Sequence, residues 1–435
     1  MDTIGIGRPV LERGLLHASL SDPAMESMNL LNQVAERYPK AVSLAAGRPF
    51  EGFYDLEDMN RYLNVFCSYL TRERGLSERD VLRILYQYGP TKGVIGELIA
   101  RHLAVDEAIE AQPAAVVVTV GAQEAMYLVL RALRAGPQDA VLAVDPTYVG
   151  LTGAALLAEM PVLPVPVAED GIDLDALVVT LRRARAAGRR VRACYLIPDF
   201  ANPIGLSMSA DNRVRLLEVA RSEDLLLIED NAYGVFHPGA ERPRTLRSLD
   251  RDGRVIYIGS FAKTGVAGAR VGFVVADQPV AAAAGPGGLL ADELGKLKSM
   301  LTVNTSPIAQ AVIGGKLIAH DFSLVAANRR ERAVYAANLQ AVLTGLDRRL
   351  GGLDGVGWNR PEGGFFVVLT VPFEVDDALL EQAAEEFGVL FTPMRHFHST
   401  PAGDRQLRLS ISNLTPEVID EGLDRLAALI RHRLA

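Results

Sequence analysis

Short apolar runs alternate with helix-like patterns between about residues 90 and 275. Continuous apolar strands separated by helices indicate an α/β fold whose sheet is mostly parallel and covered on both faces. An amphipathic stretch from Gln123 to Leu133 supplies one of the covering helices. We expect functional side chains just beyond the carboxyl ends of the strands. The runs that predict strands are 116–120, 140–144, 193–197, 225–228, 255–259 and 271–275.

The pattern changes after residue 275. Residues 276–290, rich in Ala, Pro and Gly, predict a mobile loop and not a phosphate-binding turn. The rest predicts a long helix or helix pair over 308–347, strands of a smaller α+β domain at 363–369 and 406–412, and an amphipathic helix over 416–431. We therefore predict an N-terminal arm with part of the small domain (1–60), a large domain (61–320) and a C-terminal small domain (321–435).

Composition narrows the class of protein. The chain has 435 residues, 49% of them apolar, which is enough for a large core, and no run is long enough to span a membrane. The net charge of −8 is spread along the chain without a basic stripe, so nucleic acid is not an expected partner. Two cysteines cannot form a disulfide framework, and the N-terminus resembles no secretion signal. We expect a soluble cytoplasmic protein.

Lys263 is the most informative candidate residue. It follows a predicted strand in the run Ser260-Phe261-Ala262-Lys263, seven residues before Arg270. A lysine can form an imine with an aldehyde, while a hydroxyl and an arginine nearby can bind phosphate. These are the requirements for pyridoxal 5'-phosphate (PLP). Ser-x-x-Lys alone is also typical of an exposed loop, so the hypothesis depends on the remaining partners.

Further strand ends supply groups that suit the ring of this cofactor. Asp230, after the run 225–228, can pair with the pyridine nitrogen, although an Asp there is also a common helix cap. Asn202 and Tyr233 can donate to the ring oxygen, although Asn-Pro-x-Gly is also a good β-turn. Tyr148 can stack on the ring face or pack in the core.

The phosphate of the cofactor and the carboxylate of an amino-acid substrate also need binding groups. Gly121-Ala122-Gln123, at a strand-to-helix junction, offers backbone amides and a helix dipole to the phosphate, and Ser260 and Arg270 can add side-chain contacts. Arg408, in Leu407-Arg408-Leu409-Ser410, can bind the α-carboxylate of an amino acid in a bidentate manner. The alternative interpretation is that Arg408 is only a solvent-exposed arginine on an edge strand.

The order of these groups along the chain resembles that of the fold-type I, class I/II PLP aminotransferases. The resemblance covers about residues 40–432. Within this family, the chain is most similar to the branch of the 2-aminoadipate, kynurenine and aromatic aminotransferases. It implies a large domain with a seven-stranded, mostly parallel sheet and a smaller α+β domain. It also implies ping-pong transfer of an amino group between an amino acid and a 2-oxo acid.

The resemblance assigns a role to each candidate. Lys263 bonds to the cofactor and moves the proton, Asp230 pairs with the pyridine nitrogen, and Arg408 and Asn202 serve the substrate. The implied cofactor-binding residues are Gly121, Ala122, Gln123, Tyr148, Asn202, Asp230, Tyr233, Ser260, Lys263 and Arg270. Tyr88, in Gln87-Tyr88-Gly89-Pro90, resembles the family's tyrosine that reaches the phosphate of a neighbouring subunit, which implies a homodimer. Gly47, in a segment similar to the family's substrate mouth, approaches the substrate.

The chain departs from the family at several positions. Ala262 and Ala122 stand where serine is frequent, so we expect fewer phosphate contacts and weaker cofactor binding. His396 and His398 lie where the mouth of the site is expected. No carboxylate or cysteine lies at ligand spacing beside them, so we expect no metal.

The substrate side chain is harder to predict. Phe50, Phe53 and Tyr54, with residues 396–398, favour an aromatic substrate or simply pack the entrance. Residues 19–32 and the insert 71–80 are similar to aryl-glycine transaminases of glycopeptide-antibiotic pathways. That likeness implies formation of 3,5-dihydroxyphenylglycine or 4-hydroxyphenylglycine from the aryl glyoxylate, with tyrosine or glutamate as the amino donor.

Other functions stay open on the sequence alone. The general alternative is a 2-aminoadipate, kynurenine or aromatic amino-acid aminotransferase. A PLP lyase or racemase would share the same lysine chemistry. A transcription regulator would need a DNA-binding domain of about 70 residues ahead of the fold, and the segment before residue 40 is shorter and not basic.

Overall fold

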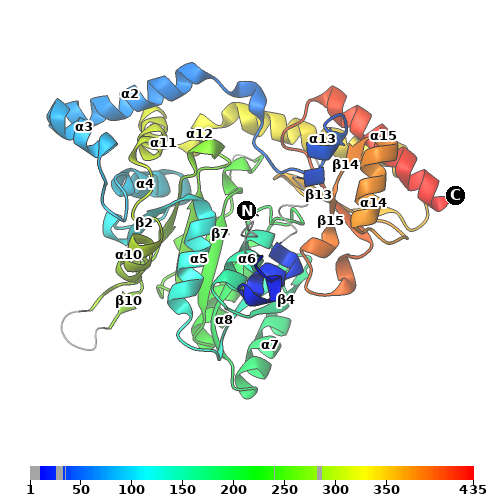
Figure 1. The fold of residues 1–435 in the computed structure, drawn as a ribbon, viewed down its shortest axis with the longest axis horizontal. Coiled ribbons are helices and arrows are strands. Elements are labelled where there is room, and N and C mark those ends of the chain that lie inside the picture. Colours follow the sequence, from blue (N-terminus) through cyan, green and yellow to red (C-terminus); the bar gives the residue numbers. More distant parts are fainter. Residues whose placement is uncertain (1–9, 26–32, 35, 240, 282–286) are drawn as a thin grey trace, which may run out of the picture.

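The computed structural model describes residues 10–25, 33–34, 36–239, 241–281 and 287–435. A large sheet with its helices occupies one side of the molecule, and a second group of strands and helices near the C-terminus occupies the other (Figure 1). The α-helices of four or more residues in these ranges are α2 (Leu56–Arg72), α3 (Glu78–Tyr86), α4 (Gly96–His102), α5 (Gly121–Leu133), α6 (Val149–Leu157), α7 (Leu174–Ala186), α8 (Ala210–Ser222), α9 (Leu246–Leu249), α10 (Leu290–Leu301), α11 (Pro307–Ala319), α12 (Leu324–Ala327), α13 (Arg329–Leu350), α14 (Asp377–Gln382) and α15 (Pro416–Leu434).

The large sheet confirms the predicted α/β class. Every pairing from β8 through to β4 is parallel, whereas β9 runs antiparallel to both of its neighbours and β5 to β4. In spatial order the strands are β2 (Val116–Thr119), β9 (Gly272–Val275), β8 (Val255–Ser260), β7 (Leu226–Asn231), β6 (Arg190–Leu196), β3 (Asp139–Asp145), β4 (Val162–Ala168) and the two-residue β5 (Gly171–Ile172). The sheet thus has seven strands of four residues or more, plus one short strand beyond the predicted seven.

Strand β4 is the one long strand that the apolar pattern did not locate. Pro164 and Pro166 interrupt its apolar residues, and proline argues against a central strand. In the structure β4 lies next to the end of the sheet, and it pairs with β3 from Val162 to Pro166. Only Val165 is fully buried, which fits its place near the edge.

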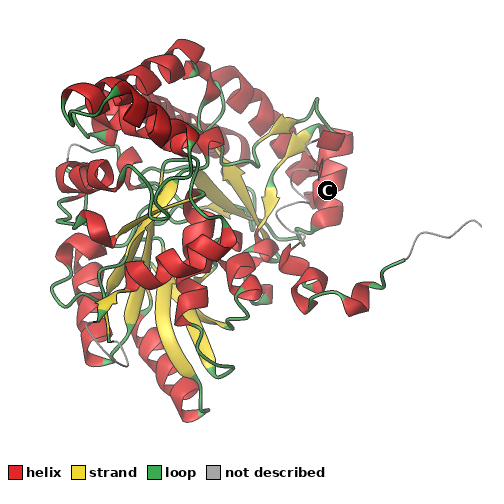
Figure 2. Cartoon of the chain, turned by 60° about the vertical axis from the view of Figure 1, so that its left-hand side comes forward, coloured by secondary structure: helices red, strands yellow, loops and turns green. Residues whose placement is uncertain are grey.

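Helices cover both faces of the large sheet (Figure 2). Buried side chains of α5, α6 and α10 pack on one face, and those of α7, α8 and α9 pack on the other. Val117 faces the first group, whereas Val116 and Val118 face a third cluster formed with α2, α4 and α11. The alternation follows from the two-residue period of a strand, and burial on both faces explains the continuous apolar runs.

The C-terminal part has its own sheet and core. Strands β12 (Gly357–Trp358), β13 (Phe366–Thr370), β16 (Gln406–Ser410) and β15 (Thr392–Pro393) form an antiparallel sheet in that order. Strand β1 (Val42–Ser43) pairs with β14 (Val389–Leu390), so an early segment joins this part. The proposed domain limits at residues 60 and 320 stay a prediction.

Helix α13 contributes to two of the apolar cores. Tyr335, near its start, contacts the rings of Phe236 and Phe365, while Leu339 and later residues pack in the C-terminal core. The segment predicted as a long helix or helix pair is therefore α11 and α13, separated by the short α12.

The predicted loop at 276–290 contains a short hairpin. Strand β10 (Pro279–Val280) pairs with β11 (Gly288–Leu289), and residues 282–286 between them lie outside the described residues. Residues 26–32, part of the segment that resembles aryl-glycine transaminases, also lie outside them. Within the described ranges, no helix is long and apolar enough to cross a membrane.

Gly315 allows α11 to pack closely on α2. A Cβ atom at this position would overlap the backbone of Tyr62. We expect Gly315→Ala to destabilise the protein by about 1–3 kcal/mol, because overpacking of this kind forces the helices apart. Thermal unfolding should show a lower Tm for this variant. Gly357→Ala is the control, since no atom lies within 4 Å of an added Cβ there; equal Tm values for the two variants would contradict the packing argument.

Candidate active site

One cavity of about 490 Å³ opens at the carboxyl ends of β3, β6, β7 and β8. Its lining includes every residue predicted for the site except Gly121 and Tyr88. The predicted residues that line it are Gly47, Ala122, Gln123, Tyr148, Asn202, Asp230, Tyr233, Ser260, Lys263, Arg270 and Arg408. The structure therefore brings together groups that lie up to 361 positions apart in the chain (408 − 47).

Lys263 lies on the loop that follows β8. Its Nζ donates a hydrogen bond to the Gly47 carbonyl oxygen at 2.5 Å. Burial, together with the positive charges of Arg408 and Arg270, lowers the pKa of the Lys263 amine to about 8. A buried amine that loses its proton near neutral pH is a good nucleophile and base.

The other lysines near the sheet are less suitable. Lys298 has no exposed surface, and its Nζ lies 2.8 Å from Oε2 of Glu124, to which it is paired. Lys296 is paired with Glu293 on the surface. Neither of them lines the cavity, so Lys263 is the candidate that geometry favours.

Asp230 is a buried carboxylate at the end of β7, only 3% exposed. The Tyr195 hydroxyl donates to its Oδ2 at 2.7 Å, while Oδ1 has no hydrogen-bond partner. Burial raises the pKa of Asp230 to about 6. A carboxylate oxygen without a donor is costly in a buried site, so Oδ1 fits a protonated ring nitrogen of a bound cofactor. Sequence reasoning missed Tyr195, because a tyrosine inside an apolar strand gives no sign of its partner.

The start of α5 and Arg270 form a site suited to an anion. Gly121 has a φ of +72°, and its lack of a Cβ lets the Arg270 guanidinium lie against it. Free amides in the first turn of a helix and a guanidinium together bind phosphate well. The Ser260 hydroxyl accepts a hydrogen bond from the Ala262 amide at 3.2 Å, which orders the loop before Lys263. Gly121 does not line the cavity, but its lack of a side chain leaves room for Arg270, which does.

Glu124 and Gln123 hold the first turn of α5 in place. Oε2 of Glu124 accepts from the Val120 amide at 2.6 Å and pairs with Lys298. The Gln123 side chain donates to the Gly150 carbonyl oxygen at 2.6 Å, which ties α5 to α6. The Glu124–Lys298 pair joins residues 174 positions apart, so sequence spacing could not reveal it.

Arg408 is a buried cation held by neutral acceptors. It is 5% exposed and lies on β16, inside the small sheet and not at its edge. Its guanidinium donates to Asn202 Oδ1 at 2.7 Å, to the Ala45 carbonyl oxygen at 3.0 Å and to Thr392 Oγ1 at 3.2 Å. Burial lowers the pKa of Arg408 to about 10, which leaves it charged at neutral pH.

Two aromatic rings enclose this guanidinium. It lies 4.3 Å from the ring centre of Phe366 and 4.7 Å from that of Phe397. No carboxylate of the described residues pairs with Arg408, and its Nε has no partner. A charged group in these surroundings is suited to a substrate carboxylate.

The tyrosines of the site differ in position. Burial raises the pKa of Tyr233 and of Tyr148, and both line the cavity. Tyr148 also packs against the core beneath it, which agrees with the core interpretation, and its stacking on a cofactor ring stays a prediction. Tyr88 lies outside the cavity and is 86% exposed.

The two histidines each face a carboxylate that is distant in sequence. His396 lies 2.7 Å from Asp377, and His398 lies 3.1 Å from Asp145, whose other oxygen accepts from the Ser399 amide. His396 also lines the cavity. The described residues contain no group of three or more metal-ligating side chains.

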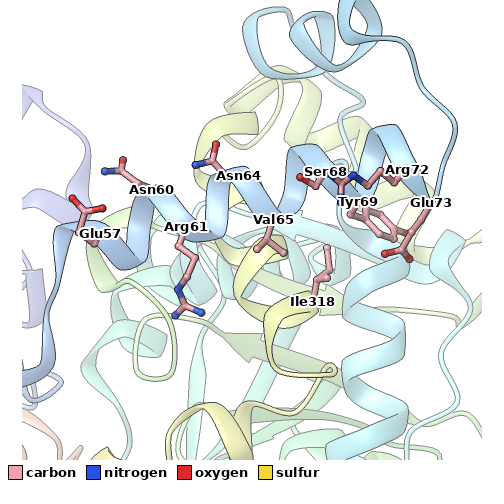
Figure 3. A pocket seen from close by; sticks show the side chains of 10 residues that line it. All are labelled: Glu57, Asn60, Arg61, Asn64, Val65, Ser68, Tyr69, Arg72, Glu73 and Ile318. Carbon is pink, nitrogen blue, oxygen red and sulfur yellow. The ribbon is translucent and has the colours of Figure 1, made fainter.

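A second hollow runs along α2 and is separate from these groups (Figure 3). Polar side chains such as Asn60, Asn64 and Arg72 line it, and none of the predicted site residues does. It therefore offers no chemistry comparable to the cavity around Lys263.

The fold and the site together are those of a fold-type I PLP enzyme. The family model for aminotransferase class I and II matches residues 81–426. The chain belongs to this aminotransferase family, and pyridoxal 5'-phosphate is its cofactor. Its substrates are amino acids and 2-oxo acids.

Individual relatives agree with this assignment. The chain is 60% identical to (S)-3,5-dihydroxyphenylglycine transaminase of Amycolatopsis orientalis, over 100% of this chain and 98% of that one. Among solved structures, it is similar to kynurenine aminotransferase of Pyrococcus horikoshii (26% identity, TM-score 0.81, 98% of each chain). It is also similar to the α-aminoadipate aminotransferase LysN of Thermus thermophilus (30% identity, TM-score 0.76, 96% of this chain and 99% of that one).

The lowered pKa of Lys263 predicts its reactivity in the cofactor-free enzyme. Its rate of reaction with an amine-selective acylating reagent should rise with pH to a midpoint near 8, because the neutral amine reacts. An ordinary lysine has its midpoint at about 10.4. Mass spectrometry of the labelled peptide gives the profile. Arg408→Met should move the midpoint upward by removing a positive neighbour, and a wild-type midpoint near 10 would contradict the assigned environment.

Proposed function

We propose that this aminotransferase acts on aryl glycines. The lead reaction is formation of (S)-3,5-dihydroxyphenylglycine or 4-hydroxyphenylglycine from the aryl glyoxylate, as a step in antibiotic biosynthesis. The observation that carries this proposal is the 60% identity, over the whole chain, to a transaminase named for 3,5-dihydroxyphenylglycine. The relatives named for aromatic amino acids and 2-aminoadipate are 29% and 32% identical.

The cavity lining supports an aromatic substrate. Phe366 and Phe397 present ring faces beside Arg408, where the group next to a bound α-carboxylate would lie. Ser43, His396 and Asn413 add polar atoms to the same lining. Apolar faces combined with a few polar groups suit a phenol ring, which needs both packing and hydrogen bonds.

Each residue has a proposed role with the cofactor. PLP, when bound, supplies an electron sink for the substrate's α-carbon. Asp230 would keep the ring nitrogen protonated, and Asn202 and Tyr233 would bind the ring oxygen. The start of α5, Ser260 and Arg270 would hold the phosphate, with Tyr148 on the ring face. These assignments use the buried, partly unsatisfied Asp230 and the anion site described above.

The chain's own groups would then move the proton and orient the substrate. Arg408 binds the α-carboxylate, which fixes the α-carbon close to Lys263. The Lys263 amine takes the α-proton, a role suited to a group with a pKa of about 8. A Cβ at Gly47 would overlap the ring of Phe366, so glycine here lets that ring keep its place beside Arg408. A lyase or racemase would use the same groups, so amino transfer to an added oxo acid is the distinguishing reaction.

A screen of single half-reactions tests the proposal. The PLP-loaded enzyme should lose its visible cofactor absorbance when 3,5-dihydroxyphenylglycine or 4-hydroxyphenylglycine is added alone. Lys263→Ala should show no covalently retained cofactor after borohydride reduction, because it lacks the bonding amine. Rapid reaction with 2-aminoadipate and none with either aryl glycine would reject the aryl-glycine proposal. Covalent labelling that persists in Lys263→Ala would reject the site.

We also propose that the protein is a homodimer. Tyr88 is 86% exposed, and the N-terminal segment carries exposed Val10, Leu11 and Leu15. This segment stands away from the main body in Figure 2, so a second subunit would give its apolar side chains a surface to cover.

Light scattering after gel filtration should give twice the chain mass. Tyr88→Phe should keep the dimer but weaken PLP binding several-fold, because the hydroxyl would reach the phosphate of the neighbouring subunit. Tyr86→Phe is the matched control, since Tyr86 is 78% exposed and two residues away. A monomer in solution, or equal PLP affinity in both variants, would reject the proposal.

A further inference from the structure

A second buried lysine contacts the loop that carries Lys263. Lys316, on α11, is 9% exposed, and its Nζ donates to the Thr264 carbonyl oxygen at 2.7 Å. Asn328, between α12 and α13, donates to the same oxygen through Nδ2 at 3.1 Å. Neither donor lines the cavity. The carbonyl of the residue directly after Lys263 is therefore held by two side chains from outside the site.

This lysine is an unfavourable group to bury. Within the described part of the chain, no carboxylate forms an ion pair with Lys316, and the Thr264 carbonyl is its one hydrogen-bond acceptor. Burial lowers the pKa of the Lys316 amine, and the charges of Glu331 and Asp58 offset only part of that effect. A methionine would fill similar space without the cost of burying an amine. Groups that cost stability in this way are retained mainly at functional sites.

The backbone that Lys316 holds is the turn around Lys263. The Gly265 amide donates to the Phe261 carbonyl oxygen at 2.8 Å, so residues 261–265 form one closed turn with Lys263 at its centre. A lysine side chain is long and flexible, so its amine keeps one position only if the backbone beneath it is fixed. A displacement of about 1 Å at a reacting group can slow a reaction about 100-fold.

The effect of Lys316 on Lys263 is one of position and not of charge. The positive neighbours that lower the pKa of Lys263 are Arg408 and Arg270, and Lys316 is not among them. The contact between the two lysines runs through the Thr264 carbonyl alone. Lys316 can therefore influence the Lys263 amine through the shape of the turn.

We propose that Lys316 is a positioning residue, whose hydrogen bond to the Thr264 carbonyl fixes the turn so that the Lys263 amine reaches the substrate's α-proton. Asn328 supports the same carbonyl. The inference rests on the proposed role of Lys263 as the proton carrier. It does not depend on which amino acid is the substrate.

The first test uses the cofactor-free enzyme and Lys316→Met, which keeps the chain length and removes the donor. Hydrogen exchange of the peptide 260–266 should be at least about fivefold faster in the variant, because the turn loses one of two donors. Its Tm should be unchanged or higher, since an apolar side chain replaces a buried amine. The acylation midpoint of Lys263 should stay near 8. Lys296→Met, an exposed lysine paired with Glu293, removes the same charge and should match the wild type.

The second test uses the PLP enzyme and the amino acid that reacts fastest in single half-reactions. Lys316→Met should lower kcat about tenfold and change KM less than about twofold, because Arg408 still binds the α-carboxylate. Deuterium at the substrate's α-carbon should slow the variant more than the wild type, since proton transfer becomes the slower step. Lys316→Gln, which keeps a shorter donor, should recover part of kcat.

Wild-type exchange in the turn of Lys316→Met, an unchanged kcat, or a lowered Tm as its only defect would overturn the inference. A shifted acylation midpoint would also overturn it, because that result would show an effect of charge. If Lys316→Met does not fold, Asn328→Ser removes the other donor and is judged by the same measurements. If neither aryl glycine reacts while another amino acid shows the loss of kcat, the inference holds and the aryl-glycine proposal fails.

Discussion

The site depends on the hydrogen bonds that hold the buried guanidinium of Arg408. It donates to Asn202 after β6, to Ala45 near the N-terminus and to Thr392 in the small sheet, so it connects three segments of the chain. All three acceptors are neutral. A buried cation without a counter-charge is costly, and hydrogen bonds to neutral oxygens offset only part of that cost. The arrangement therefore favours an anion close to Arg408, which a substrate carboxylate can provide.

The same balance of charges sets the chemistry of the neighbouring groups. Burial and the charges of Arg408 and Arg270 lower the pKa of Lys263, so the amine can lose its proton near neutral pH. Asp230 is buried with one unsatisfied oxygen, and its raised pKa reflects burial without a cationic neighbour. A protonated cofactor ring would supply that cation and stabilise the carboxylate. In this site, a substrate carboxylate and a protonated cofactor ring would thus match the buried charges of Arg408 and Asp230.

The sequence predicted the parts of the structure that depend on local pattern. Burial on both faces makes the central strands continuously apolar, so the sequence showed where these strands end. Asp230, Ser260 and Lys263 lie at or just after such ends, and all three line one cavity in the structure. Strand β4 was missed because proline argues against a central strand. Its place near the edge of the sheet, where proline is tolerated, cannot be read from the sequence.

Contacts between distant segments could not be predicted from spacing. The partners of Asp230, Glu124 and His398 lie in other elements, and nothing in the local sequence identifies Tyr195, Lys298 or Asp145. The carboxylates that face His396 and His398 could not be identified from sequence spacing for the same reason. Both histidines face an aspartate once the chain is folded.

The mouth of the site is where discrimination between substrates must arise. The α-carboxylate is common to the amino-acid and 2-oxo-acid substrates, so its proposed binding by Arg408 would not distinguish them. Part of the remaining lining comes from Ser43 and residues 45–48 and from His396 and Phe397, two segments far apart in the chain. The backbone of the second segment is tied to the end of β3, since the Thr147 amide donates to the Phe397 carbonyl oxygen at 3.0 Å and Ser399 donates to Asp145. Selectivity would then follow from side chains at the mouth, while Lys263, the proposed proton carrier, lies on the loop after β8.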